Sequence, residues 1–247
     1  MIELERLSKS YNKGQIKAVK DLTLTVGKGE LFGFLGPNGA GKTTTLKMLV
    51  GLLRPDAGCA RVQGIDIRRD PLGAKRLIGF CPDEPVLYDK MTGIRFLSFI
   101  GDVYSMSQSA RTKAVEALAE DFEMKDGLRE VISSYSHGMR QKLSLIAALM
   151  HDPQVLILDE PIVGLDPRAA FILKEKMRAL CASGKTVFFS THIMEVAEKL
   201  CDRVGIIAHG ELVAAAPLEE LRRREGEADA TLEKLFLEMT DETVHAR

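Results

Sequence analysis

The chain has 247 residues, of which 45% are hydrophobic and 28% charged, and its formal net charge is −1 at pH 7. These values are ordinary for a globular protein with a sizeable core. They exclude a global charge that would draw the chain to nucleic acid or to an anionic membrane. The longest apolar runs are much shorter than the roughly 18 residues that a membrane span requires. The N-terminal residues are charged from Glu3 onward and lack the apolar segment of a secretion signal.

The four cysteines, Cys59, Cys81, Cys181 and Cys201, form no CxxC pair and no regular framework. This spacing favours small hydrophobic side chains in a reducing compartment over disulfides or a metal site. We therefore expect a soluble, cytosolic protein.

Apolar periodicity predicts strands and helices in alternation along the chain. Strands are expected over 2–7, 22–26, 30–36, 60–67 and 77–82, with a loop over 10–15 and a helix over 45–53. Residues 92–128 have helical spacing with no strand between. Further strands are expected over 155–161 and 186–192 around a helix over 169–180, then a hairpin over 204–216 turning at His209 and Gly210, and an amphipathic helix over 231–239.

This alternation predicts an α/β fold with a largely parallel sheet. We interpret the chain as one unit in three parts. A core with a β subdomain covers 1–91 and 136–215, a helical insertion covers 92–135, and a C-terminal helical tail covers 216–247.

The strongest motif is GPNGAGKT, residues 36–43, which fits G-x-x-x-x-G-K-[ST] between a predicted strand and a predicted helix. Its glycines let successive backbone N–H groups converge on a β-phosphate, and the helix N-terminus adds partial positive charge. Lys42 is expected to bridge the β- and γ-phosphates, and the Thr43 hydroxyl to ligate Mg²⁺. The alternative is a glycine-rich turn without a ligand.

A second candidate group follows the apolar strand VLILDEP, which ends in Asp159 and Glu160. Open α/β sheets bind ligands at the carboxyl ends of their strands. We expect Asp159 to hold the Mg²⁺ shell and Glu160 to orient and polarise an attacking water. Alternatively, the pair caps a helix before Pro161. His192 ends another apolar strand and could hydrogen-bond a γ-phosphate, although a lone histidine is more often a structural group.

The stretch SSYSHGMRQK, residues 133–142, has the pattern of a second phosphate-facing helix start. Ser136 is a candidate N-cap and Gly138 a permissive residue, beside backbone N–H groups that can meet an anion. A chain that binds one nucleotide needs only one such cradle, so the second helix start requires an explanation.

These motifs and their order resemble the ATP-binding subunits of ABC (ATP-binding cassette) transporters over essentially the whole chain. GPNGAGKT resembles Walker A, SYSHGMRQK the signature, VLILDEP Walker B, GLDP the D-loop and STH the switch histidine. The resemblance implies a P-loop NTPase core with a mainly parallel sheet, an N-terminal antiparallel β subdomain and an inserted α-helical subdomain. It also implies ATP and Mg²⁺ as cofactors and ATP hydrolysis as the activity.

Two subunits of this family pair head to tail, as a homodimer or a heterodimer. The resemblance therefore implies that each ATP lies between the P-loop of one subunit and the signature helix of the other. Tyr11 would stack on the adenine, Ser136 and Gly138 would face the γ-phosphate held by the partner, and Asp166 would couple the two sites. The residues placed at the nucleotide are Tyr11, Gly36, Pro37, Asn38, Gly39, Ala40, Gly41, Lys42, Thr43, Thr44, Ser136, Gly138 and Asp166. One chain would then have two phosphate-facing helix starts because it helps to build two sites.

Two positions depart from the family pattern. His137 replaces a glycine of the usual LSGGQ signature, which matters if the backbone there needs a positive φ. Asp83, in IGFCPDEP, stands where the family usually has glutamine. Its carboxylate could ligate Mg²⁺ or orient water, but it adds negative charge beside the phosphates. Glu84 is a neighbouring candidate of lower rank.

The short chain, the PDEPVLYDKMTG run and the TLEKLFLEM ending resemble ABC-2-type ATPases, which are commonly linked to export. The resemblance implies a motor on the cytoplasmic face of the membrane that acts through separate permease subunits. In the family, the region of segment 85–100 receives a helix from the membrane partner. The alternative is that this segment forms the core of the insertion.

A soluble ABC-type ATPase that powers DNA repair or translation is the alternative function. Such machines have long coiled-coil insertions, two cassettes in one chain or strongly basic surfaces. This chain has one cassette, a short insertion and a net charge of −1, so we expect no nucleic-acid partner. A nucleotide kinase would share the P-loop, but not SYSHGMRQK, GLDP and STH together.

Overall fold

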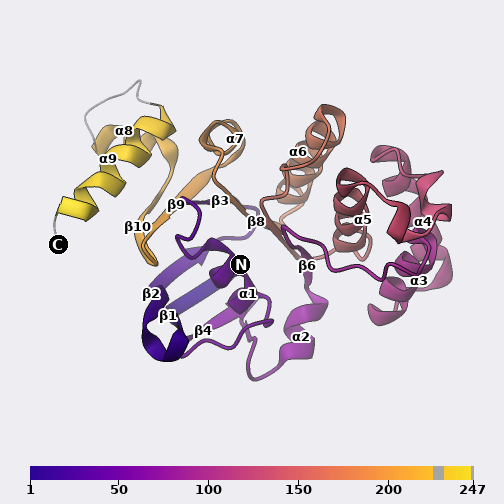
Figure 1. Ribbon diagram of the computed structural model, residues 1–247, viewed down its shortest axis with the longest axis horizontal. Helices are drawn as coiled ribbons and strands as arrows, with labels where there is room; N and C mark the ends of the chain where they lie inside the picture. The colour runs from indigo at the N-terminus through magenta and orange to yellow at the C-terminus, as the bar shows by residue number, and fades with distance from the viewer. Residues whose placement is uncertain (225–230, 246–247) are drawn as a thin grey trace.

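The computed structural model describes residues 1–224 and 231–245. In this part of the chain the strands form two sheets (Figure 1). The first sheet is antiparallel, in the order β2-β1-β4-β5, and the second has the order β10-β9-β3-β8-β7-β6. The strands are β1 (Ile2–Tyr11), β2 (Ile16–Val26), β3 (Leu31–Leu35), β4 (Ala57–Val62), β5 (Ile65–Asp66), β6 (Ile78–Cys81), β7 (Val155–Asp159), β8 (Thr186–Thr191), β9 (Arg203–Ala208) and β10 (Glu211–Ala216).

The second sheet is parallel except at its edge, where β10 pairs antiparallel with β9. Its strands β3, β7 and β8 are buried along their whole length, as is typical of parallel strands covered on both faces. Because β6, β7, β8 and β3 are neighbours that run in the same direction, their carboxyl ends meet at one edge of the sheet. The predicted α/β fold with a parallel sheet and an N-terminal antiparallel β subdomain is therefore confirmed.

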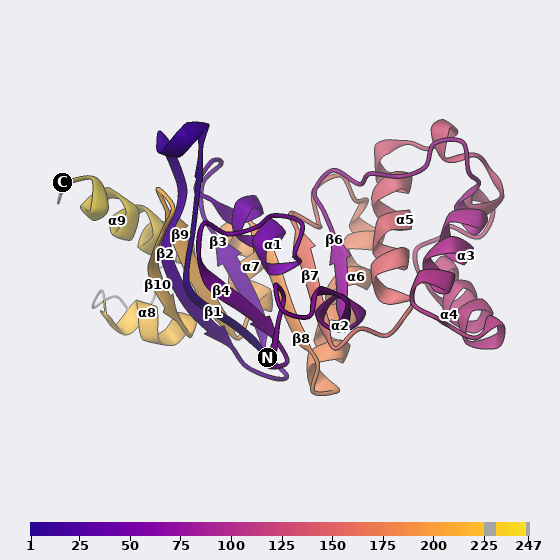
Figure 2. The same ribbon diagram turned by 90° about the horizontal axis from the view of Figure 1, so that it is seen from below.

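Helices connect the strands and cover the parallel sheet (Figures 1 and 2). In both views α3 and α4 lie at the end of the molecule opposite to α9. The α-helices are α1 (Lys42–Leu49), α2 (Pro71–Arg76), α3 (Gly93–Val103), α4 (Gln108–Asp121), α5 (His137–Leu149), α6 (Pro167–Ala182), α7 (Met194–Leu200), α8 (Leu218–Arg224) and α9 (Leu232–His245), and short 3₁₀ turns occupy Asn12–Gly14, Gly127–Arg129 and Ile132–Ser134. No helix in the described ranges is both long enough and apolar enough to cross a membrane.

Helix α1 is held between the two sheets. Its buried side chains Leu46 and Leu49 share one hydrophobic cluster with Leu4 of β1 and Phe34 of β3. The Phe188 ring of β8 lies 5.4 Å from the Phe34 ring, centroid to centroid, within the same cluster. Burial of such side chains stabilises the fold by about 1.5–3 kcal/mol each. The start of α1, where the P-loop lies, is thus fixed against the carboxyl end of β3.

The two ends of the helical segment between β6 and α5 contact each other. A bridge pairs Thr92 with Val131, and the Gly93 N–H donates to the Glu130 carbonyl at 3.2 Å. The hydroxyl of Tyr135 donates to the Gly127 carbonyl at 2.6 Å. These contacts return the chain to the edge of the core immediately before α5 begins.

Three local features differ from the sequence-based expectation. The first hairpin is longer, since β1 continues to Tyr11 and β2 begins at Ile16; register shifts along the pair let this ribbon bend and continue through residues expected to form a loop. Periodicity did not predict α2 and α7, because helices of six or seven residues are too short to repeat an apolar stripe. A local signal marks α2, where Asp70 caps the helix and Pro71 is its first residue.

Two further expectations concern the end of the chain. The hairpin turn at His209 and Gly210 is confirmed, with φ of +51° and +81° at the two residues and Glu211 paired to Ala208. The expected tail over 216–247 contains α8 and α9, while residues 225–230 and 246–247 of that tail lie outside the described residues.

Candidate functional site

The P-loop follows β3 and opens α1, and two of its glycines are required by close backbone contacts. A Cβ atom at Gly41, where φ is +110°, would lie 2.3 Å from the Ala18 carbonyl oxygen. A Cβ atom at Gly36 would lie 2.4 Å from the Ile207 carbonyl oxygen. The loop curves around a pocket of about 170 Å³, lined by Ala18, Pro37, Asn38, Gly39, Gly41, Lys42, Thr43, Thr44, Asp83 and Glu160. Sequence reasoning predicted these lining residues except Ala18.

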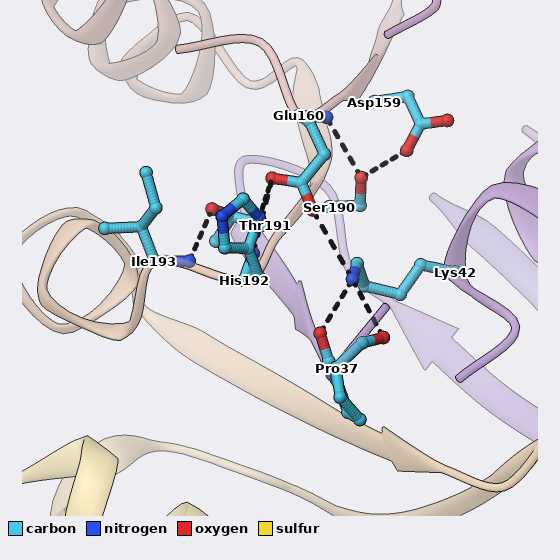
Figure 3. Close-up of polar contacts among 9 residues, drawn as sticks. Pro37, Lys42, Asp159, Glu160, Ser190, Thr191, His192 and Ile193 are labelled. Atoms are coloured by element: carbon cyan, nitrogen blue, oxygen red, sulfur yellow. Dashed lines mark hydrogen bonds and ion pairs between the residues drawn. The ribbon is translucent and has the colours of Figure 1, made fainter. Parts of the chain in front are cut away.

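Lys42 holds a buried ammonium group inside this pocket (Figure 3). Its Nζ donates to the Gly36 carbonyl at 2.7 Å and to the Pro37 carbonyl at 3.3 Å. It also lies 3.4 Å from Oε1 of Glu160. A lysine ammonium has three donors and no acceptor, and here its three described contacts all go to oxygen acceptors. Phosphate oxygens are groups of that kind.

Glu160 follows the last residue of β7 in a conformation unusual for a side-chain-bearing residue, with φ of +46°. Backbone states of this kind cost about 1–3 kcal/mol and occur preferentially at functional sites. Its Oε2 accepts a hydrogen bond from the His192 backbone N–H at 3.3 Å and lies 3.0 Å from Nδ1 of the same residue. Its Oε1 is buried and accepts no hydrogen bond from any described residue; its one described ionic contact is with the Lys42 ammonium at 3.4 Å.

Asp159 is 1% exposed, and its Oδ1 accepts a 2.5 Å hydrogen bond from the Ser190 hydroxyl. Sequence reasoning did not predict Ser190 as a site residue. The available signal was its position, two residues before His192 in the otherwise apolar run TVFFSTH. Residues two apart in a strand point to the same face of the sheet. In the predicted strand 186–192, a polar residue two before the histidine is therefore expected on the same face as the histidine.

Asp83 follows the carboxyl end of β6 by two residues and lines the pocket together with the P-loop residues. Partial desolvation raises the pKa of its carboxyl group, and the negative charges of Asp159 and Glu160 raise this pKa further. These carboxylates thus repel one another near one edge of the sheet. Within residues 1–224 and 231–245, no group of three or more His, Cys, Asp or Glu side chains is arranged so that it could hold a metal ion by itself. Carboxylate and hydroxyl oxygens are nevertheless the donor type that Mg²⁺ prefers.

The signature helix α5 begins where the sequence predicted. Ser136 is its N-cap, and its Oγ accepts a hydrogen bond from the Met139 N–H at 3.3 Å. His137 is the first helical residue and does not have a positive φ, so it takes the place of the family's glycine without backbone strain. Its ring lies against Gly164 of the D-loop, where an added Cβ atom would approach the imidazole to 2.5 Å.

Asp166 ties the D-loop to the signature helix. It caps α6 by accepting from the Ala169 N–H at 2.9 Å, and its Oδ2 lies 2.6 Å from Nζ of Lys142 on α5. The hydrogen bond from Lys142 lowers the pKa of the Asp166 carboxyl group. The starts of α5 and α6 therefore form one connected surface.

The predicted site residues thus form two groups. The P-loop residues, Asp83, Asp159, Glu160 and His192 lie around or beside the phosphate pocket. Among the residues that the structure describes, those lining this pocket do not include Ser136, Gly138 or Asp166. Ser136 and Gly138 lie at the start of α5, and the D-loop residue Asp166 is joined to that helix through Lys142. Tyr11 does not line the pocket either; it ends β1 with 40% of its surface exposed.

Comparisons with known proteins agree with this architecture. The family model of the ABC transporter matches residues 19–163. The ABC transporter ATP-binding protein NatA of Bacillus subtilis is 39% identical over 232 residues, covering 93% of this chain and 94% of NatA. The Nod factor export ATP-binding protein I of Paraburkholderia xenovorans is 41% identical over 213 residues, covering 86% of this chain and 69% of that protein.

Two solved structures are similar over most of their length. An ATP-binding subunit of an ABC transporter has a TM-score of 0.92 at 32% identity, covering 97% of this chain and 99% of that one. A dimeric ATP-binding cassette in a post-hydrolysis state, bound to ADP and Pi, has a TM-score of 0.81 at 25% identity, covering 88% and 99%. The chain belongs to the ABC transporter family, as an ATP-binding protein that hydrolyses ATP.

The raised pKa of Asp83 generates a prediction about pH. The folded protein holds this proton more tightly than the unfolded chain, so the stability linked to it is fully present below the ordinary aspartate pKa of 3.8 and is lost as pH rises through the raised value. Asp83→Asn removes the charge, so it should increase the free energy of unfolding at pH 7 and leave it nearly unchanged near pH 3.8. Urea unfolding of the nucleotide-free protein at a series of pH values measures this difference.

Asp166→Asn is the matched control, because asparagine keeps the helix cap but loses the ion pair with Lys142 that lowers the aspartate pKa. It should change the free energy of unfolding in the opposite direction at pH 7. Both effects should be small, since the two carboxylates are exposed to solvent. A lower stability of Asp83→Asn at pH 7 would contradict the electrostatic account of this site.

Proposed function

We propose that this chain is the motor subunit of an exporter, in which two copies close around two ATP molecules and drive a separate permease. In this arrangement each ATP lies between the P-loop of one copy and the signature helix of the other. The observation that carries the proposal is the separation of the two groups within one chain. The α5 start with Ser136 and Gly138 has the geometry of an anion site but lies outside the chain's own phosphate pocket.

ATP binding would begin at the P-loop. Residues 36–44 supply backbone N–H groups to the phosphates, and Lys42 exchanges its contacts with Glu160 and two carbonyls for the β- and γ-phosphates. Tyr11, exposed at the end of β1, stacks on the adenine. Release of Glu160 from Lys42 then leaves its carboxylate available for a water molecule.

Hydrolysis would use groups at the carboxyl ends of the strands. Once Lys42 has moved to the phosphates, Glu160 accepts a proton from the attacking water through Oε1. His192, whose ring lies beside the same carboxylate, donates to the γ-phosphate, and Asp83 orients the water from the opposite side. Thr43, Asp159 and Asp83 would hold a Mg²⁺ ion, which, when bound, neutralises charge on the phosphates.

The signature helix would act on the partner's ATP. Its N-cap Ser136 and the backbone N–H groups near Gly138 stabilise the γ-phosphate held by the other P-loop. Asp166 is joined to this helix through Lys142, so closure at one site is transmitted to the D-loop that contacts the second site. Loss of the γ-phosphate on hydrolysis removes its contact with the signature helix of the other subunit, so the two subunits separate.

The permease would bind near the start of the helical insertion 92–135. Exposed apolar side chains gather there, with Val86, Tyr88 and Phe99 all at least 40% exposed. The Tyr88 and Phe99 rings are in edge contact at 5.8 Å between centroids. A permease bound here would hold the subunit on the cytoplasmic face of the membrane. The export direction rests on the similarity to the Nod factor export protein and on the ABC-2-type features of the sequence.

Glu160→Gln tests the hydrolytic role. It keeps the shape of the side chain but removes the base, so ATP turnover should fall by roughly 100- to 10,000-fold while ATP still binds. Light scattering after size-exclusion chromatography should then show a dimer that depends on ATP. Glu195→Gln, a change at an exposed residue of α7 paired with Lys199, is the control and should behave as wild type. Wild-type turnover in Glu160→Gln would remove Glu160 from its proposed role.

A second test addresses the permease. The affinity-tagged chain, purified from its native membranes in detergent, should retain an integral membrane protein, and Tyr88→Ala with Phe99→Ala should reduce that recovery at least several-fold by loss of apolar contact area. Phe171→Ala removes an aromatic side chain from α6 that is at least as exposed as Tyr88 and Phe99, and it should leave recovery unchanged. Equal recovery with all variants, or no membrane protein with the wild type, would contradict the proposed docking surface.

A further inference from the structure

Ser190 is a buried hydroxyl at the centre of the site that none of the proposed ATP contacts uses. It is the second-last residue of β8, its surface is 0% exposed, and it lies directly opposite Asp159 in the β7–β8 register. Figure 3 shows its side chain between Asp159 and Glu160. It does not line the phosphate pocket, so any effect on hydrolysis passes through a neighbouring residue.

The hydrogen bonds of Ser190 have a defined direction. An ionised carboxylate only accepts, so the Ser190 hydroxyl donates its proton to Oδ1 of Asp159 at 2.5 Å. The lone pairs of Oγ then remain for the backbone N–H of Glu160, which donates to it at 3.1 Å. The same N–H also faces the Ser190 carbonyl oxygen at 3.2 Å.

The hydrogen bonds from the Glu160 N–H to Oγ and to the carbonyl oxygen of Ser190 act on a strained backbone. Glu160 adopts a positive φ that side-chain-bearing residues disfavour. Its carboxylate direction follows from that backbone state, and the carboxylate in turn contacts Lys42 and His192. Loss of the Oγ acceptor leaves the N–H with the more distant carbonyl alone, so Glu160 can relax toward an ordinary conformation and its carboxylate moves.

We propose that Ser190 is a positioning residue for ATP hydrolysis, which fixes the Glu160 backbone in its strained conformation and thereby aims the carboxylate. This inference rests on the proposed role of Glu160 as the base. Asp159 serves in it as the acceptor that orients the hydroxyl.

The first experiment compares Ser190→Ala with Ser190→Thr. Ser190→Ala should lower kcat by about 10- to 100-fold, the effect of a small misplacement of a catalytic group. ATP affinity should stay within about threefold of wild type, because the P-loop is untouched. Ser190→Thr retains the hydroxyl and should restore kcat to within about threefold. Should Ser190→Ala fail to fold, Ser190→Cys takes its place, with the same loss expected from a weak donor and acceptor.

Thr186→Ala is the matched control for a buried hydroxyl in the same strand. The Thr186 hydroxyl donates to the Gly27 carbonyl at 2.8 Å, at the end of β8 away from the site, and the residue is 0% exposed. Its removal should lower thermal stability without changing kcat of the folded protein. Equal losses of kcat in Thr186→Ala and Ser190→Ala would assign Ser190 a merely structural role and overturn the inference.

A double-mutant cycle decides whether Ser190 acts through Glu160. In the Glu160→Gln background, Ser190→Ala should change the single-turnover rate by less than about twofold, since the carboxylate that it positions is gone. The inference would be overturned if Ser190→Ala lowered the rate by the same factor in the wild-type and Glu160→Gln backgrounds. It would also be overturned if the kcat of Ser190→Ala stayed within about twofold of wild type. Wild-type hydrolysis by Glu160→Gln itself would instead refute the proposed base, so the two failures are distinguishable.

Discussion

The site depends on one constraint, the parallel arrangement of neighbouring strands whose carboxyl ends meet at the same edge. β3 ends at the P-loop, β7 at Asp159 and Glu160, and β8 at Ser190 and His192. The P-loop is more than a hundred residues from the ends of β7 and β8 in the chain, and those two ends are 31 residues apart at Asp159 and Ser190. The register of β3 with β8 and of β7 with β8 brings all three segments together. The buried aromatic side chains between the two sheets keep this edge and the start of α1 together.

Charge within the pocket is arranged in two opposing sets. Lys42 and the P-loop N–H groups are positive, while Asp83 and Glu160 in the pocket and the nearby Asp159 are negative. After desolvation, the charges of Asp159 and Glu160 are the largest causes that raise the pKa of Asp83. The Lys42–Glu160 pair joins the two sets at 3.4 Å. A buried ion pair of this kind is a poor source of stability; in the proposed function its cation would bind phosphates and its carboxylate would activate a water molecule. ATP binding would therefore exchange one buried charge pair for another, without leaving Lys42 unpaired.

The sequence predicted the fold class and most of the pocket because the P-loop and the strand ends are marked by local motifs. The long strands 155–161 and 186–192 were predictable for the same reason, since unbroken apolar runs are typical of central parallel strands. Other features have no such local signal. The hydrogen bonds of Ser190 depend on β7–β8 register, the contact of His137 with Gly164 depends on how α5 meets the D-loop, and the bend of the first hairpin depends on register shifts. Sequence periodicity carries no information on such contacts between segments.

The central claim of the account is that each ATP site is built from two chains. Two variants test it most directly, Lys42→Ala with a damaged P-loop and Gly138→Asp with a carboxylate at the signature helix, each combined with Glu160→Gln to preserve bound ATP. In a mixed dimer the account places both lesions in one site and leaves the other site intact, whereas sites built within one chain would each keep a lesion. Native mass spectrometry should detect an ATP-dependent dimer in the mixture and none with either variant alone. The absence of ATP-dependent association in the mixture, where Glu160→Gln alone associates, would contradict the account.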